Sequence, residues 1–316
     1  MGKPVLIFIL IILSVVSLFT GVVSISFTSI FNMSHEQYVV MVASRVPRLI
    51  SIIIAGMSMS ICGLIMQQLT RNKFVSPTTA GTMDAARLGV LVSMLVFTNA
   101  TLFRRTLFAF IFTMLSTMIF LKVLEKIRYK NVVFVPLVGI MFGNIIASIT
   151  MFFAYRNDIV QNVNSWLIGD FSSVIRGRYE LIYISIPLVI LAYLYANRFI
   201  VAGLGEDMAK NLGLNYKATI NLGFAIVSII TSVVLLTVGA IPFLGLIIPN
   251  IVSIIWGDNL KKTLPYTAIC GAIFLLMCDI LGRIIIYPFE VPISLTVAII
   301  GGTIFIYLLF RRELRG

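Results

Sequence analysis

The chain has 316 residues, of which 59% are hydrophobic and only 11% are charged, and its mean hydropathy is +1.06. Soluble domains carry about 45–50% apolar and about 25% charged residues, so a soluble enzyme, a disordered chain and a secreted disulfide scaffold are excluded. The net charge of +12 does not require nucleic acid, because Lys and Arg collect in the cytoplasmic loops of membrane proteins. The apolar runs lack the alternation of a membrane barrel. The composition predicts a polytopic α-helical membrane protein.

Ten apolar runs approach the length of about 20 residues that crosses a bilayer. In chain order they cover about 4–23, 48–69, 78–98, 105–124, 132–154, 180–198, 218–239, 243–256, 265–286 and 291–310. The third begins with polar residues, and the eighth is short. No linker or soluble domain separates them. The sequence therefore predicts one transmembrane domain, 1–316, that is all-α with about ten spans.

The distribution of basic residues predicts the orientation. The first run is too long for the apolar region of a signal peptide and no A-x-A site follows it, so we expect a retained first helix. With the N-terminus inside, fifteen of the 24 Lys and Arg residues lie inside, eight lie outside and Arg87 lies within a span. This bias predicts that both termini are cytoplasmic. The longest external loops are then about 24–47 and 155–179, and the longest internal loop is about 199–217.

The residues that membrane enzymes need are scarce. Cys62, Cys270 and Cys278 lie in apolar runs without a C-x-x-C pair, which is typical of small core residues. No metal set can be built around His35, the single histidine. No G-x-x-x-x-G-K-[ST] motif occurs, so we expect no nucleotide site, cofactor or metal in this chain. A pump would take its energy from a partner subunit or from an ion gradient.

Ionisable residues within spans are the candidates for ion coupling. Asp84 and Arg87 are three residues apart, and Asp279 and Arg283 are four apart, so each acid shares a helix face with a base. Paired charges near helix ends are the simpler interpretation. This spacing weakens the ion-coupled alternative without excluding it.

The internal segment 203–213 predicts a short helix on the cytoplasmic face. Glu206 suits its first turn, Lys210 its last, and Gly213 its end. Met208, Ala209 and Leu212 would form an apolar ridge. Two interpretations remain open: an idle amphipathic connector, or a helix that fits a groove on a cytoplasmic partner.

The external Arg45-Val-Pro-Arg48 opens the second span, where Pro47 suits a helix start. The two arginines share one helix face, so they are either interfacial anchors or docking points for carboxylates of an external partner. Glycines within the spans indicate close helix packing; they include Gly56, Gly63, Gly89, Gly139, Gly143, Gly271, Gly301 and Gly302.

Taken together, these stretches resemble the FecCD/BtuC-like permease subunits of ABC importers for iron–siderophore, haem and cobalamin. The resemblance covers nearly the whole chain. Its motifs are, in order, Arg45-Val-Pro-Arg48; Gly56, Gly63, Gln67, Arg71-Asn72, Pro77 and Gly81; Trp166 and Gly169; Gly205-Glu206, Ala209 and Leu212-Gly213; Gly239 to Pro249; Asp279 and Arg283; and Glu290-Val-Pro292, Thr296 and Gly301.

The chain departs from the family pattern at six positions. Lys73 and Phe74 follow Asn72 where the family usually has Pro and Leu. Asn250 and Ser253 stand where the family commonly has His and Arg, and Asp84 and Arg87 stand where small residues are usual. These differences bear on the inner gate or on the choice of partner, and they leave the resemblance intact.

The resemblance implies a BtuC-like fold of ten helices. It also implies a second permease copy, identical or paralogous, two cytoplasmic ABC ATPases that hold ATP and Mg, and an external or periplasmic binding protein. The matching positions imply docking of that protein at Arg45, Arg48 and Arg283, and ATPase coupling at Gly205, Glu206, Ala209, Leu212 and Gly213. Transport would proceed by alternating access.

The leading hypothesis is a bacterial cell-membrane permease that imports a ferric siderophore. A haem or cobalamin permease of the same family is the first alternative. An ion-coupled secondary transporter is the alternative from another class, and a membrane enzyme or assembly scaffold ranks lower. A neighbouring ATPase gene, or a need for ATP rather than an ion gradient, would separate these hypotheses.

Overall fold

The computed structural model describes residues 2–21, 23, 34–97, 100–126, 134–165 and 168–313. The described residues form helices and turns without strands. In chain order these are α1 (Lys3–Phe19), α2 (His35–Val40), the π-helix η2 (Met41–Arg45), α3 (Val46–Thr70), α4 (Thr82–Val96), α5 (Leu102–Lys126), α6 (Phe134–Arg156), α7 (Val160–Ser165), the 3-10 turn η3 (Glu180–Ile184), α8 (Ser185–Leu194), α9 (Ala196–Ala202), α10 (Glu206–Asn211), α11 (Tyr216–Val238), α12 (Leu244–Trp256), α13 (Leu260–Ile284) and α14 (Ile293–Glu313).

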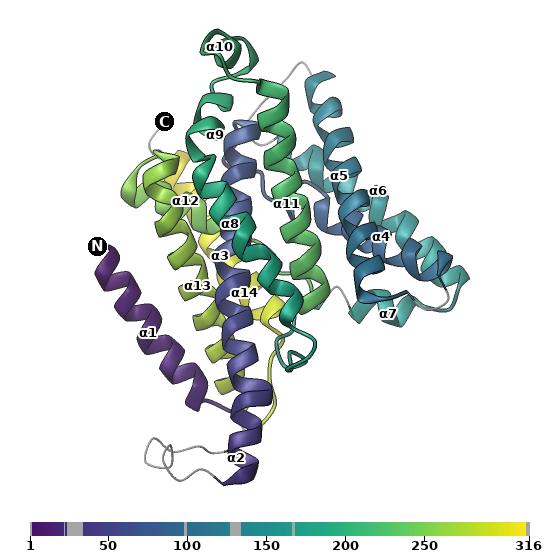
Figure 1. Ribbon diagram of the computed structural model, residues 1–316, viewed down its shortest axis with the longest axis vertical. Coiled ribbons are helices and arrows are strands. Elements are labelled where there is room, and N and C mark those ends of the chain that lie inside the picture. Colours follow the sequence, from purple (N-terminus) through teal and green to yellow (C-terminus); the bar gives the residue numbers. More distant parts are fainter. Residues whose placement is uncertain are drawn as a thin grey trace.

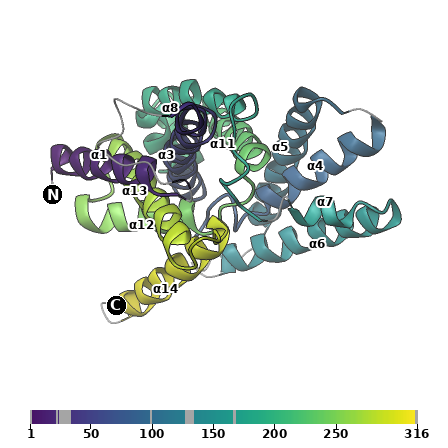
Figure 2. The same ribbon diagram turned by 90° about the horizontal axis from the view of Figure 1, so that it is seen from below.

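Helix α3 is the centre of the molecule. It packs against α13, α12, α11 and α8, and these helices surround it in both ribbon views (Figures 1 and 2). Helices α4 to α7 form a group at one side, joined to the rest largely through α11. The short helix α10 projects at one end of the molecule, and α2 lies at the opposite end (Figure 1). These are named the α10 end and the α2 end.

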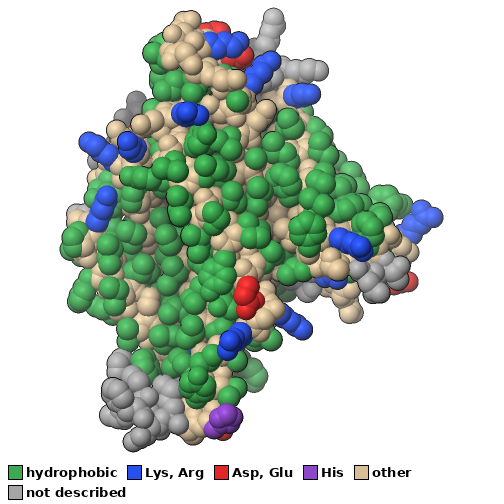
Figure 3. Space-filling model, in the orientation of Figure 1, with side chains coloured by type: hydrophobic (Ala, Val, Ile, Leu, Met, Phe, Trp, Pro, Cys, Tyr) green, Lys and Arg blue, Asp and Glu red, His purple; other side chains and the backbone are tan. Residues whose placement is uncertain are grey.

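The chain is a multi-pass membrane protein. Five continuous helical stretches, including the one at His35–Thr70, are long and apolar enough to cross a membrane, and a bent pair makes up to six. Three shorter apolar helices accompany them. Figure 3 shows hydrophobic side chains covering the middle of the molecule, with basic groups gathered mostly toward its ends. This distribution suits a bilayer that surrounds the middle of the helix bundle.

Each of the ten predicted spans contains a helix, but two details of the prediction were wrong. The predicted external loop 24–47 is helical from His35, because Ser34 and Gln37 form a reciprocal capping box. The predicted sixth span is not continuous, since α8 and α9 meet at an angle of 61°. The third predicted span, which begins with polar residues, corresponds to the short helix α4. The eighth, which is short, corresponds to α12. Trp166 and residues 24–33 of the predicted loop lie outside the described residues.

Glycines bring the central helices into backbone contact. A Cβ added to Gly63 on α3 would lie 1.7 Å from the Gly245 carbonyl oxygen of α12, and one added to Gly56 would lie 2.7 Å from that of Gly271 on α13. In lipid, helices associate through such close packing rather than through the hydrophobic effect. The packing prediction therefore holds along α3. It was wrong for Gly302, which has no such neighbour within 4 Å.

We predict that Gly63→Ala lowers the stability of the purified protein in detergent, measured by thermal unfolding. The added methyl group must push α3 and α12 apart, and overpacking of this kind costs about 1–3 kcal/mol. Gly302→Ala on α14 is the matched control and should leave the unfolding temperature unchanged or slightly higher, because alanine favours a helix. Equal unfolding temperatures for the two variants would contradict the contact.

Candidate functional site

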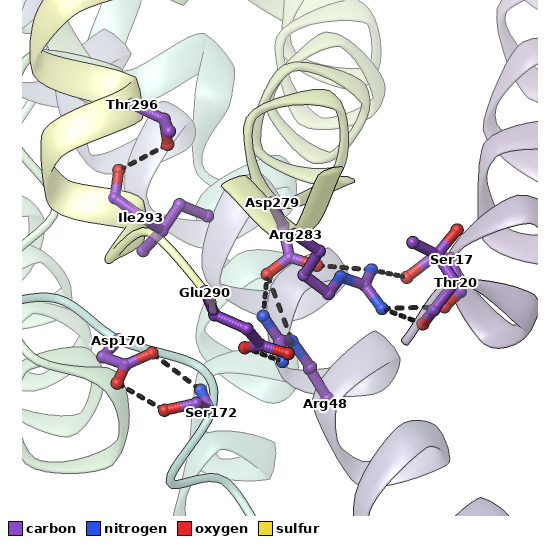
Figure 4. A network of polar contacts seen from close by, with 10 residues as sticks. All are labelled: Ser17, Thr20, Arg48, Asp170, Ser172, Asp279, Arg283, Glu290, Ile293 and Thr296. Atoms are coloured by element: carbon purple, nitrogen blue, oxygen red, sulfur yellow. Dashed lines mark hydrogen bonds and ion pairs between the residues drawn. The ribbon is translucent and has the colours of Figure 1, made fainter. Parts of the chain in front are cut away.

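At the α2 end, a network of charged side chains joins three parts of the fold (Figure 4). Arg48 on α3 donates through Nε and Nη2 to Asp279 Oδ1 on α13, at 3.1 and 2.7 Å. Its Nη1 donates to Glu290 Oε2, at 2.7 Å, in the segment between α13 and α14. Arg283 Nη2 lies 2.6 Å from Asp279 Oδ2. Two guanidinium groups thus share two carboxylates, so the network carries no net formal charge.

Two arginines of this end also hold the end of α1. Arg283 Nη1 donates to the backbone carbonyls of Ser17 and Thr20, at 2.9 and 2.8 Å. Arg45 donates to the carbonyls of Leu18, at 2.5 Å, and Val23. Carbonyls at the end of a helix lack intrahelical hydrogen-bond donors. The N–H groups of the two guanidinium groups serve as donors to them.

This placement corrects the predicted exposure of the docking arginines. Arg45 and Arg283 are buried, with 7% and 5% of their surface accessible, and the Arg48 side chain is 12% exposed. Their guanidinium groups are occupied by carbonyls and carboxylates of the same chain. Arg45 and Arg48 also diverge, one toward α1 and the other toward α13. Glu290, with 27% of its side chain exposed, is the most accessible acid of the network.

The second predicted acid–base pair also forms. Arg87 Nη1 lies 2.9 Å from Asp84 Oδ1, near the start of α4. The Asp84 carboxylate lies against α6, because a Cβ on Gly143 would be 2.7 Å from its Oδ2. Both membrane acids singled out in the sequence therefore have basic partners, as their spacing predicted. Asp279, however, pairs with Arg48 as well as with Arg283. Sequence spacing did not reveal the pairing with Arg48.

The predicted short helix is present as α10, and its end has the expected geometry. Gly213 has a φ of +78°. Its N–H donates to the Lys210 carbonyl, while the Leu214 N–H donates to that of Ala209, both at 2.9 Å. These two bonds form a Schellman motif. Hydrogen bonding between the Glu206 and Lys210 side chains lowers the pKa of Glu206 and raises that of Lys210, so the pair remains charged around neutral pH.

The apolar ridge of α10 differs from the predicted one. Met208 and Leu212 are 55% and 62% exposed, and Leu204 just before the helix is 53% exposed. Ala209 is fully buried because it faces the chain itself, where α10 packs against α9 and α11. Its small side chain allows α10 to pack closely against α9 and α11, and it is not accessible to a partner. The exposed ridge is therefore Leu204, Met208 and Leu212.

A polar pocket of about 300 Å³ lies at the α10 end, beside the last turn of α3. Its lining includes Gln68, Arg71, Lys73, Gly203, Asp258 and Thr263. Lys73 Nζ lies 2.6 Å from Asp258 Oδ1 and donates to Ser253 Oγ at 2.8 Å. Sequence spacing does not reveal this pair, because its members are 185 residues apart.

Asn250 and Ser253, two of the residues that depart from the family pattern, contribute to the same region. Asn250 Nδ2 donates to the carbonyls of Lys73 and Leu246, both at 2.7 Å. Ser253 bonds Lys73, as described above, and its hydroxyl also bonds Asp258 Oδ1. Both side chains thus tie α12 to the segment that follows α3.

An apolar pocket of about 240 Å³ lies between α6, α12 and α14. Phe305 lines it, with its ring centroid 5.8 Å from that of Phe74 and 6.4 Å from that of Phe243.

The three cysteines are free thiols. Among the described residues, no group of three or more His, Cys, Asp or Glu residues could hold a metal ion.

Comparison with known proteins places these features in a family. The sequence pattern of the FecCD transport family matches residues 9–311. The petrobactin import system permease protein YclN of Bacillus subtilis (strain 168) is 60% identical over 304 residues, which is 96% of each chain. The ferric-anguibactin transport system permease protein FatD of Vibrio anguillarum is 41% identical, covering 93% of this chain and 94% of that protein.

A solved structure has the same fold. It is described as an inward-facing conformation of a metal-chelate type ABC transporter, and it superposes with a TM-score of 0.82, covering 97% of both chains at 22% identity. The fold prediction of a BtuC-like permease is thereby confirmed.

We predict that Asp279→Asn destabilises the protein by about 3–5 kcal/mol, because it leaves buried Arg283 without an acidic partner and Arg48 with Glu290 alone. Thermal unfolding in detergent measures the loss. Glu206→Gln, which breaks the exposed pair with Lys210, should have no measurable effect, since surface pairs contribute little. Similar stabilities for the two variants would show that the network does not hold the α2 end together.

Proposed function

Because the chain belongs to the FecCD transport family, we propose that it is the permease subunit of an ABC importer that brings a ferric siderophore into a bacterial cell. The relatives named for petrobactin and ferric-anguibactin support this class of substrate over haem or cobalamin. A partner subunit hydrolyses ATP, an external binding protein delivers the chelate, and a second permease copy completes the path. The chain itself carries no nucleotide site. Both termini are cytoplasmic.

The α10 end is the cytoplasmic, ATPase-facing end. The observation that carries this assignment is the ridge of Leu204, Met208 and Leu212, three apolar side chains exposed on a helix that projects beyond the bundle. Exposed apolar side chains that gather on one element mark interaction sites. Ala209 and the Schellman motif hold α10 rigidly, so movement of a bound ATPase reaches α9 and α11. Gly205, Glu206, Ala209, Leu212 and Gly213 thus position the ridge or form part of it.

We predict that Met208→Glu combined with Leu212→Glu abolishes ATP-driven uptake of the iron-loaded siderophore and weakens ATPase association at least tenfold. The two carboxylates would have to be desolvated in an apolar interface. Association is measured with the purified, detergent-solubilised chain, and uptake in cells that lack the native permease.

The control for this variant is Lys210→Gln, on the far side of α10, which should change neither quantity by more than about twofold, because exposed pairs contribute little. Membrane insertion should be normal in both variants. Normal ATPase association and uptake in the double variant would refute α10 as the docking helix.

The α2 end is the external end, where the binding protein docks. Arg48 is the docking arginine that a partner can reach, because its neighbour Glu290 is partly exposed while Asp279 and Arg283 are buried. Arg45 and Arg283 contribute indirectly, by fixing α1 and Asp279. A carboxylate of the binding protein replaces Glu290 on Arg48 Nη1. Without that exchange, a third carboxylate would enter a network that two carboxylates already neutralise.

We predict that Glu290→Gln strengthens binding-protein docking several-fold, since it removes the internal competitor for Arg48. Affinity is measured by titrating the substrate-loaded binding protein onto the chain in nanodiscs at low and high salt. Glu180→Gln, which neutralises another exposed acid of the α2 end, is the matched control and should have no effect. Arg48→Gln added to Glu290→Gln should cancel the gain. Unchanged or weaker docking of the single variant would rule out the exchange.

A further inference from the structure

Arg71 lies at the α10 end of the central helix α3. It ends α3 with a φ of 52° and a ψ of 34°, the left-handed conformation that glycine or asparagine usually adopts at this position. Its backbone N–H donates to the Gln68 carbonyl, and the Asn72 N–H donates to that of Gln67. The side chain is exposed. Within the described part of the chain, its guanidinium has no hydrogen bond or ion pair, whereas those of Arg45, Arg48, Arg87 and Arg283 are all bonded.

The guanidinium of Arg71 lies directly beside the start of α10. A Cβ placed on Gly205, the residue before α10, would be 2.3 Å from Arg71 Nη2 and 2.9 Å from its Cζ. Gly205 has a φ of +115°, which only glycine adopts readily. The absence of a side chain there lets the guanidinium rest against the backbone. A partner that covers α10 must therefore also cover Arg71.

Arg71 also lines the polar pocket of about 300 Å³. The acid of this pocket, Asp258, is already engaged by Lys73 and Ser253. The charge on Arg71 is thus uncompensated where the pocket meets α10. Burying a charge under a partner is costly unless the partner supplies an opposite charge and hydrogen-bond acceptors.

We propose that this pocket receives an acidic side chain of the ATPase, whose carboxylate pairs with the Arg71 guanidinium. The proposal rests on the proposed function, since it takes the α10 end as the ATPase-docking end. It adds to the apolar ridge of α10 a second, charged point of contact on α3. The guanidinium fork can bind a carboxylate through two parallel hydrogen bonds, which also fixes the orientation of the partner. Because α3 is the central helix, this contact would connect the ATPase directly to the middle of the helix bundle.

The test measures the affinity of the purified chain for the ATPase encoded with it, in lipid-free detergent, at 0.05 and 0.5 M salt. Arg71→Asn removes the charge but keeps a residue that tolerates the left-handed conformation, so the fold is retained. We expect it to weaken binding about tenfold and to reduce the salt dependence. Arg71→Glu should weaken binding further, and Arg71→Lys, which keeps the charge but not the two-bond fork, should fall between the wild type and Arg71→Asn.

Arg198→Asn is the matched control. Arg198 is an exposed arginine of α9, with its guanidinium 4.7 Å from the Tyr195 ring centroid, and its loss should change affinity by less than twofold. If Arg71→Asn matches this control in affinity and salt dependence, the inference is overturned while the ATPase-docking role of α10 stands. The measurement is repeated in membranes with anionic lipid. An effect of Arg71 that is absent in detergent and appears only there also overturns the inference, because the guanidinium would then bind a headgroup. If the wild-type chain fails to bind the ATPase, the proposed function itself is refuted.

Discussion

Asp279 is the residue on which the α2 end depends. Its side chain is 1% exposed, and its two oxygens are held by Arg48 from α3 and Arg283 from its own helix. A charged group in an apolar medium must be paired and hydrogen-bonded within the protein. The pairing therefore fixes where α3 meets α13. Arg283 extends the constraint to α1 through the carbonyls of Ser17 and Thr20, and Arg48 extends it to Glu290 before α14. Helices α1, α3 and α13 and the segment before α14 are thus positioned by Asp279, Glu290 and the two arginines that they neutralise.

The two ends of the helix bundle satisfy their polar groups differently. At the α2 end, Arg48 and Arg283 are balanced by Asp279 and Glu290, and buried Arg45 is bonded to backbone carbonyls. At the α10 end, the pairs Lys73–Asp258 and Glu206–Lys210 are more exposed, and Arg71 has no partner among the described residues. The first arrangement closes and stabilises an end of the bundle. The second leaves charge and apolar surface available to a cytoplasmic partner, and this difference fits an importer with distinct partners on its two sides.

Close backbone contact between the central helices explains how movement at one end of the bundle can reach the other end. Gly63 and Gly245 bring α3 and α12 together, while Asn250 and Lys73 tie α12 to the segment after α3. Rigid contact of this kind transmits displacement, since tightly packed interiors do not absorb it. Displacement of the α10 end by an ATPase would therefore reach α12, α13 and the charged network beyond them along the central helix.

The sequence by itself determined the membrane class, the ten apolar segments, the short helix that ends at Gly213 and the Asp84–Arg87 and Asp279–Arg283 pairs, because all of these depend on composition or on spacing within one helix. Only the tertiary structure decided that Arg48 reaches Asp279, 231 residues away, that Lys73 reaches Asp258, and that Ala209 faces inward while Met208 and Leu212 face out. Helical periodicity fixes which residues share a face of one helix. It does not fix which neighbour that face meets, because the direction of a face is set by the packing of helices far apart in the chain.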